Sequence, residues 1–180
     1  MKGKRSELAA LCDSVDPDVM LISETKLDST VSSSEFLPSY YNAHRLDRTI
    51  NGGGVMVAVR NTFVVDEVKM ENTSSEMVTV KIDIRNSSPL YVAAFYRPPD
   101  EHISKLDSFE HAMEQLSDKI NRNSKATVMV GGDFNVGDID WEKDTVKEGS
   151  RKKTLCEKVL NIITESHLTQ LQKEPTRKDQ

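Results

Sequence analysis

Residues 127–135 read Thr-Val-Met-Val-Gly-Gly-Asp-Phe-Asn, an apolar run that leads through two glycines to two polar side chains. The run from Thr127 to Val130 is typical of a buried strand and predicts the most buried strand of the chain. Asp133 and Asn135 are then expected just beyond the strand end, where a rigid scaffold can hold functional side chains at an exposed rim. The alternative is an ordinary turn in which both side chains hydrogen-bond to their own backbone.

The same arrangement, a polar group directly after an apolar strand, recurs twice. Glu24 follows the run over residues 19–23, and Tyr96 follows the run over residues 90–95. Hard divalent cations prefer oxygen ligands, which makes Glu24 a candidate metal ligand. A nearby Asp can orient or deprotonate a water, and an amide such as that of Asn135 can donate to a phosphoryl oxygen. Each feature also has a plainer explanation: a solvated strand end for the glutamate, and the end of an edge strand, stopped by two prolines, for the tyrosine.

The hydrophobic periodicities predict a mixture of strands and helices in one domain over residues 1–180. Strands are expected over residues 19–23, 41–46, 55–59, 77–84, 90–96 and 127–130, and helices over residues 4–15, 103–121 and 151–165. The buried stripes expected on the first two helices are Leu8, Leu11, Cys12 and Val15, and Ile103, Leu106, Phe109, Met113, Leu116 and Ile120. Because there are several strands per helix, the order predicts an α+β fold with largely antiparallel sheets, not a doubly wound parallel sheet.

Size and charge restrict the classes of function. A chain of 180 residues is about one domain long, and its formal net charge is -5. That charge argues against binding nucleic acid through the global field of the protein, although a local basic groove remains compatible with it. Cys12 and Cys156 lie among apolar residues at helical spacing, which predicts small core side chains in a reducing compartment. No apolar run reaches signal-peptide or membrane-span length, so an intracellular protein is expected.

Five motifs taken together resemble the endonuclease/exonuclease/phosphatase superfamily, and most closely the endonuclease domain of non-long-terminal-repeat (non-LTR) retrotransposons. They are Leu21-Ile22-Ser23-Glu24-Thr25-Lys26-Leu27, Gly52-Gly53-Gly54-Val55, Phe95-Tyr96-Arg97-Pro98-Pro99, Gly132-Asp133-Phe134-Asn135 and Pro175-Thr176-Arg177. Their order and approximate spacing cover almost the whole chain. The Glu-Thr and Gly-Asp-Phe-Asn motifs are the specific ones, whereas a glycine triplet alone is a weak signal.

The resemblance implies a β-sandwich of two sheets with helices on both outer faces, a four-layer αββα architecture with the site at one rim. It implies that Glu24 ligates a catalytic Mg²⁺ or Mn²⁺, that Tyr96 contacts the scissile phosphate and that Asp133 orients or activates the attacking water. Asn135 is implied to bind a phosphate oxygen or to help place Asp133, and Thr176 to contact the phosphate. The implied reaction is metal-assisted hydrolysis of a DNA phosphodiester. In a retrotransposon such a nick exposes a 3′ hydroxyl that primes reverse transcription, which implies a reverse transcriptase of the same element as a partner. A nuclear location is expected, with the cytoplasm as the alternative.

The chain departs from the family pattern at both ends, so the sandwich is expected to be incomplete there. Relatives begin with a strand that ends in an Asn near the metal, and continue beyond Pro-Thr-Arg into an Asp-bearing strand and a Ser-Asp-His segment. The four histidines lie outside that context and are expected to be surface or structural residues: His44, His102, His111 and His167. Impaired catalysis is therefore expected of what reads as a fragment or a degenerate copy. Two alternatives stay open: a non-catalytic mobile-element remnant, and a phosphatase of the same superfamily.

Overall fold

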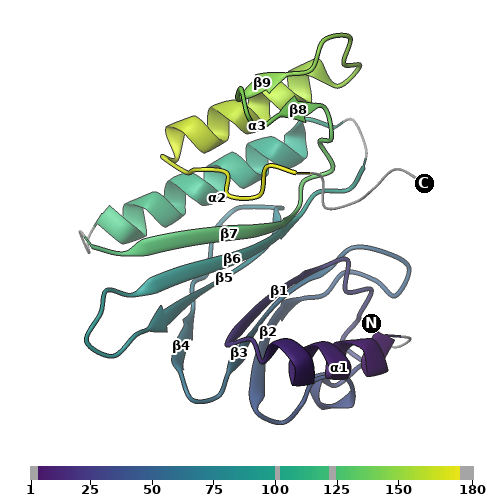
Figure 1. Cartoon of the computed structure of the whole chain (residues 1–180), viewed down its shortest axis with the longest axis vertical. Helices are drawn as coiled ribbons and strands as arrows, with labels where there is room; N and C mark the ends of the chain where they lie inside the picture. The colour runs from purple at the N-terminus through teal and green to yellow at the C-terminus, as the bar shows by residue number, and fades with distance from the viewer. Residues whose placement is uncertain (1–3, 100–101, 122–124, 175–180) are drawn as a thin grey trace.

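A computed structural model describes residues 4–99, 102–121 and 125–174 of the chain (Figure 1). Its helices and strands follow in the order α1 (Arg5–Val15), β1 (Val19–Ser23), η2 (Ser33–Glu35), β2 (Tyr41–Leu46), β3 (Val55–Arg60), β4 (Val64–Glu67), β5 (Glu76–Asp83), β6 (Leu90–Tyr96), α2 (Ser104–Asn121), β7 (Thr127–Asp133), β8 (Ile139–Asp140), β9 (Thr145–Val146) and α3 (Lys153–Glu165). The element η2 is a single 3-10 turn. Each helix and strand expected from the sequence forms at or near its predicted position.

Two larger sheets form the centre of the fold. One has the order β1-β3-β2 and is antiparallel throughout, and the other has the order β4-β5-β6-β7. In the second sheet β6 and β7 run parallel, because α2 carries the chain back between them, and the other pairs are antiparallel. The prediction of largely antiparallel sheets is therefore confirmed, with this pair as the exception. The short strands β8 and β9 form a separate hairpin.

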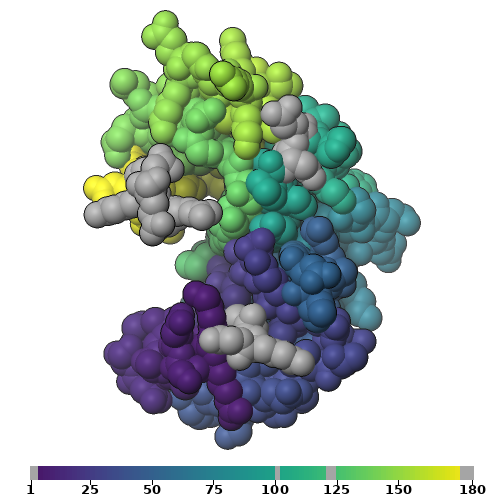
Figure 2. Space-filling model, turned by 90° about the vertical axis from the view of Figure 1, so that its right-hand side faces the viewer, coloured from purple at the N-terminus to yellow at the C-terminus, as the bar shows by residue number. Residues whose placement is uncertain are grey.

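The two sheets pack face to face, because each strand alternates its side chains between an inner and an outer face. Val55, Val57 and Val59 of β3 belong to this inner core together with Val80 of β5 and Val92 of β6. The helix α1 packs on the outer face of the first sheet, and α2 and α3 pack on the outer face of the second (Figure 1). This is the predicted αββα arrangement. The view turned by 90° shows the N-terminal part of the chain (purple and blue) below and the C-terminal part (green to yellow-green) above (Figure 2).

The strand β7 differs from its prediction in both burial and length. The sequence predicted that residues 127–130 form the most buried strand of the chain, yet Met129 is 46% exposed. Among the described strands, β7 pairs only with β6, and a strand with one neighbour leaves part of its inner face uncovered. The strand also continues through both glycines to Asp133, so Asp133 is its last residue and Asn135 lies two residues beyond its end.

The predicted helix stripes were partly wrong. Leu11 is 47% exposed and Val15 is 63% exposed, because α1 buries the face that carries Leu8 and Cys12 and turns the neighbouring face to solvent. Ile103 is 40% exposed because it lies before the first helical residue of α2. The strand β4 and the hairpin β8-β9 were not predicted, since they are short and carry polar residues.

Both cysteines behave as expected from the sequence. Cys12 and Cys156 are free thiols with no exposed surface, and burial raises the pKa of each thiol. They are core side chains of α1 and α3. In the part of the chain that the structure describes, no helix combines the length and apolarity needed to cross a membrane.

Candidate active site

A row of three polar side chains crosses the second sheet at one rim of the sandwich. Tyr96 is the last residue of β6, and its direct neighbours in register are Glu76 on β5 and Asp133 on β7. Directly opposed residues of neighbouring strands project from the same face of a sheet. The ring of Tyr96 packs in the core between the two sheets, so the whole row lies on the inner face, at its edge.

The first sheet adds a fourth polar group to this rim. Glu24 follows the last residue of β1, and its Oε1 accepts a hydrogen bond from the Tyr96 hydroxyl at 3.1 Å. The side chain of Glu24 is 46% exposed, and its Oε2 lies 3.8 Å from Lys26 Nζ. Three strands from two sheets therefore bring together Glu24, Tyr96 and Asp133, three of the residues singled out in the sequence.

Acidic neighbours and burial act together on the Tyr96 phenol. Burial, the hydrogen bond to Glu24, and the negative charges of Glu24, Asp133 and Glu76 raise the pKa of Tyr96 to about 12. Each of these effects disfavours the phenolate. The tyrosine is therefore a protonated hydrogen-bond donor at neutral pH and not a nucleophile.

The turn after β7 is held by its own side chains. Asp133 Oδ1 accepts from the backbone N of Asn135 at 3.0 Å, which is the local Asp turn that formed the plainer alternative. The other carboxylate oxygen of Asp133, Oδ2, receives no hydrogen bond from the described residues. Asn135 adopts a left-handed conformation with φ 52, and its Nδ2 donates to the backbone O of Arg97 at 2.6 Å. The aspartate is thus exposed but fixed, and the asparagine amide contacts backbone.

Arg97 lies beneath this turn and was given no role from the sequence. Its side chain has no exposed surface, and Nε donates to the backbone O of Phe134 at 2.7 Å while Nη2 donates to that of Asn135 at 2.9 Å. Its backbone N donates to Asp133 O at 2.9 Å. Nothing in the local pattern predicts this burial, because an arginine after a strand is ordinarily solvated.

The two glycines of β7 allow close approach of three strands. At Gly132, where φ is +148, an added Cβ would lie 1.8 Å from the backbone O of Phe95. At Gly131 an added Cβ would lie 2.6 Å from Cδ1 of Leu21, so β7 approaches β1 here as well as β6. A side chain at Gly132 would push Asp133 away from the strand end that carries Tyr96, because the clash is with backbone.

Glu76 is a second residue that the sequence reasoning missed. Its side chain is 13% exposed, Oε1 accepts from Arg48 Nη1 at 2.6 Å, and Oε2 accepts from the backbone N of Gly54 at 2.9 Å. The alternating pattern of residues 77–84 could have identified Glu76. Continuing the period of two back from Val78 places Glu76 on the inner face beside Tyr96.

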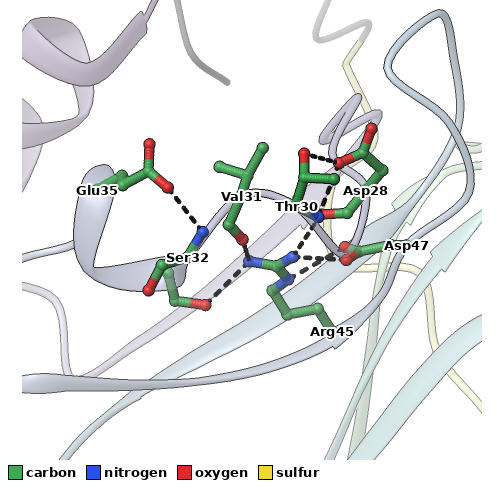
Figure 3. Close-up of polar contacts among 8 residues, drawn as sticks. Asp28, Thr30, Val31, Ser32, Glu35, Arg45 and Asp47 are labelled. Carbon is green, nitrogen blue, oxygen red and sulfur yellow. Dashed lines mark hydrogen bonds and ion pairs between the residues drawn. The ribbon is translucent and has the colours of Figure 1, made fainter.

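The segment after Glu24 is tied to the first sheet by Arg45 of β2. The Arg45 guanidinium donates to the backbone O of Asp28 at 3.1 Å and of Val31 at 2.9 Å, and it pairs with Asp47 (Figure 3). Figure 3 also shows the Ser32 amide held by Glu35, which closes the turn of η2. These bonds give the loop after Glu24 a defined path back to β2.

The remaining predicted site residues lie elsewhere. Thr176 is outside the described residues. His44 Nδ1 lies 3.7 Å from Glu67 Oε2 and His111 Nδ1 lies 3.5 Å from Glu114 Oε2, contacts that suit the expected surface or structural histidines.

The donor groups at the rim match one mode of metal binding. Within residues 4–99, 102–121 and 125–174, no three His, Cys, Asp or Glu side chains converge closely enough to enclose a metal ion. Mg²⁺ does not need such a cage, because it commonly takes one or two carboxylates and completes its shell with water and phosphate. The half-exposed carboxylate of Glu24, at a rim where Asp133 of β7 also lies next to Tyr96, fits this mode.

The rim of the αββα sandwich thus carries carboxylates on both sides of a protonated tyrosine. Comparison with known families matches residues 1–170 to the Endonuclease/Exonuclease/phosphatase family. The chain belongs to this family. No curated protein matches the chain.

Solved structures with the same fold include nucleases and phosphatases. The endonuclease domain of TRAS1, a telomere-specific non-LTR retrotransposon, superposes with a TM-score of 0.61 at 17% identity, over 88% of this chain and 64% of that one. The 3′ phosphatase NExo from Neisseria, bound to a product DNA hairpin, superposes with a TM-score of 0.58 at 15% identity, over 89% of this chain and 66% of that one. The human Nocturnin catalytic domain superposes with a TM-score of 0.57 at 11% identity, over 76% of this chain and 58% of that one. The chain thus spans about two thirds or less of these relatives, and the likeness establishes the fold.

Proposed function

We propose that the chain is a divalent-metal-dependent endonuclease domain that hydrolyses DNA phosphodiesters, of the kind carried by non-LTR retrotransposons. The observation that carries the proposal is the hydrogen bond of 3.1 Å between Tyr96 and Glu24, with Asp133 directly beside Tyr96 in register. It joins a metal-ligating type of side chain, a hydrogen-bond donor and a potential base at one exposed rim.

In this proposal Glu24 holds Mg²⁺ or Mn²⁺ through its exposed carboxylate. When bound, the ion stabilises negative charge on the phosphate and the leaving oxygen. The Tyr96 hydroxyl donates to a phosphoryl oxygen, a role that its pKa of about 12 supports at neutral pH. Asp133 orients the attacking water and accepts its proton through the carboxylate oxygen that the turn leaves open.

Asn135 had two roles open to it, and its contacts favour one. Its amide nitrogen donates to Arg97 O and its backbone nitrogen to Asp133 Oδ1, so we assign it to placing Asp133. Thr176 remains proposed as a contact to the phosphate. A reverse transcriptase of the same element as partner, and a nuclear location, belong to the same proposal, because the nicked DNA supplies the primer.

The test is nicking of supercoiled plasmid DNA in the presence and absence of Mg²⁺ or Mn²⁺. Nicking is expected to require the ion, and Asp133→Asn is expected to lower its rate by about 10²-fold or more, the usual effect of removing a general base. Asp144→Asn is the control, because Asp144 is an exposed aspartate in the turn between β8 and β9. Equal nicking by both variants would overturn the assigned chemistry. DNA binding without turnover in the wild type would favour the non-catalytic alternative.

The second candidate function is a phosphatase acting on DNA ends. It is favoured by the likeness to NExo, which is described as a 3′ phosphatase with product DNA. An oligonucleotide hairpin with a 3′ phosphate distinguishes the two, since release of inorganic phosphate from an intact hairpin, with plasmid left supercoiled, selects this candidate over the endonuclease.

A further inference from the structure

The rim contains a contact between the two sheets that the proposed roles leave unused. Glu76 begins β5, and its carboxylate reaches the turn before β3, where Oε2 accepts from Gly54 N at 2.9 Å. The other oxygen accepts from Arg48 Nη1 at 2.6 Å. With the side chain 13% exposed, both contacts lie largely away from water, where charge-assisted hydrogen bonds are strong.

The turn that Glu76 holds also supports the backbone beside Glu24. Gly54 O accepts from Thr25 N at 3.2 Å, and Gly53 O accepts from Lys26 N at 3.0 Å. These two amides belong to the residues directly after Glu24, so the turn fixes the path of the chain as it leaves β1. Glu24 itself is held at φ 53, a left-handed conformation that a glutamate adopts only where its surroundings impose it.

Glycine is required at this turn for a steric reason. A Cβ on Gly53, where φ is +75, would lie 2.6 Å from Glu76 Oε2, and a Cβ on Gly54, where φ is +85, would lie 2.4 Å from Thr25 Oγ1. The two glycines therefore let Glu76 close on the turn from one side and Thr25 from the other. The contacts form a continuous chain from β5, through the glycine turn, to the residues after Glu24.

We propose that Glu76 is a positioning residue that fixes the Glu24 carboxylate against Tyr96 by holding the glycine turn from the opposite sheet. Glu76 also pairs with Tyr96 in register across β5 and β6. Glu76 thus lies next to Tyr96 and, through the glycine turn, supports the backbone after Glu24. The inference rests on the proposed function in that Glu24 is taken as the metal ligand.

The first test measures the backbone directly. Amide hydrogen exchange at Thr25 and Lys26 is expected to become roughly tenfold faster in Glu76→Ala, the effect of losing about one net hydrogen bond. Asp83→Ala is the matched control, because Asp83 ends the same strand and its Oδ1 pairs with Lys81 Nζ at 2.7 Å. Exchange at both amides is expected to match the wild type in the control. Unchanged exchange in Glu76→Ala overturns the proposal.

A conservative variant separates positioning from folding. Glu76→Gln keeps an oxygen that can accept from Gly54 N but loses the charge that pairs with Arg48, so its exchange rates are expected between those of wild type and Glu76→Ala. If Glu76→Ala does not fold, the glutamine variant decides the question: faster exchange confined to Thr25 and Lys26 supports positioning. Equally faster hydrogen exchange at all amides overturns the positioning role of Glu76.

The second test measures Mn²⁺ affinity by electron paramagnetic resonance, which needs no turnover. Glu76→Ala is expected to weaken binding about tenfold or more, as for outer partners of metal ligands, with Asp83→Ala unchanged. Glu24→Gln serves as the reference for loss of the ligand. If Glu24→Gln loses Mn²⁺ but Glu76→Ala keeps full affinity, the inference fails and the proposed function stands. If Glu24→Gln binds Mn²⁺ normally, the metal assignment in the proposed function fails, and amide exchange alone decides on Glu76.

Discussion

Arg97 and Asn135 hold each other through reciprocal hydrogen bonds. Arg97 Nη2 donates to the backbone O of Asn135 at 2.9 Å, and Asn135 Nδ2 donates to the backbone O of Arg97 at 2.6 Å. Arg97 directly follows Tyr96, and Asn135 lies two residues after Asp133. The pair therefore couples the ends of β6 and β7, the two strands that carry the candidate donor and the candidate base.

Arg97→Met is expected to lower the free energy of unfolding by about 3 kcal/mol, because it removes a buried charged donor from two carbonyl groups. Urea unfolding followed by circular dichroism measures the change. Arg97→Lys is expected to recover only part of the loss, since an ammonium cannot reproduce the planar, two-nitrogen contact of a guanidinium. Arg151→Met, at an exposed position, serves as the control and should match the wild type. An unchanged urea midpoint for Arg97→Met would refute the structural role.

Gly132→Ala is expected to destabilise the fold by about 3 kcal/mol or more, since its Cβ would overlap the backbone of β6. The clash is with Phe95 O at 1.8 Å, and a backbone atom cannot move aside as a side chain can. Thermal unfolding measures the loss. Gly137→Ala is the control in the same segment, because an added Cβ there meets nothing within 4 Å. Equal melting temperatures for the two variants would show that β7 does not approach β6 as described.

The features predicted from the sequence depend on local pattern. The end of the strand over residues 90–96 was predicted from two prolines that cannot donate to a ladder, and β6 ends at Tyr96. Glu24 was identified because a polar residue follows a short apolar run. The resemblance to the family then joined Glu24 and Tyr96 into one site, although they are 72 residues apart in sequence.

The features that escaped prediction depend on contacts between distant segments. The role of Glu76 depends on its contact with the turn at Gly54, which belongs to the other sheet. The role of Arg97 depends on its contact with Asn135, which is distant in sequence. The burial of β7 was overestimated for a related reason. An apolar run gives the propensity to form a strand, but the number of its neighbours decides how much of Met129 is covered.

Thr79→Val is expected to stabilise the protein by about 1 kcal/mol, because it removes a buried hydroxyl that lacks a partner. Thr79 is 2% exposed on β5, and its Oγ1 makes no hydrogen bond within the described part of the chain. Valine has nearly the same shape and a high strand propensity. Thr145→Val, exposed on β9, is the control and should leave the urea midpoint close to that of the wild type. A loss of stability in Thr79→Val would indicate that a bound water satisfies the hydroxyl.

The raised pKa of Tyr96 predicts a loss of stability at alkaline pH. The ordinary pKa of 10 applies to the unfolded chain, and the folded value is about 12, so the folded state binds this proton more tightly. The stabilisation is fully present below pH 10 and is lost as the pH rises through 12. Within that window the free energy of unfolding should fall by about 1.4 kcal/mol per pH unit because of this group.

Tyr96→Phe removes the titrating group, so its free energy of unfolding should fall less steeply than that of the wild type between pH 10 and 12. Urea unfolding across this range and the difference in phenolate absorbance between the two proteins both measure the effect. Glu24→Gln should move the titration of Tyr96 toward the ordinary value without reaching it, because burial, the largest cause of the shift, remains. Superimposable stability curves for wild type and Tyr96→Phe would mean that the phenol is solvated, and that Glu24 and Tyr96 do not form the contact on which the site depends.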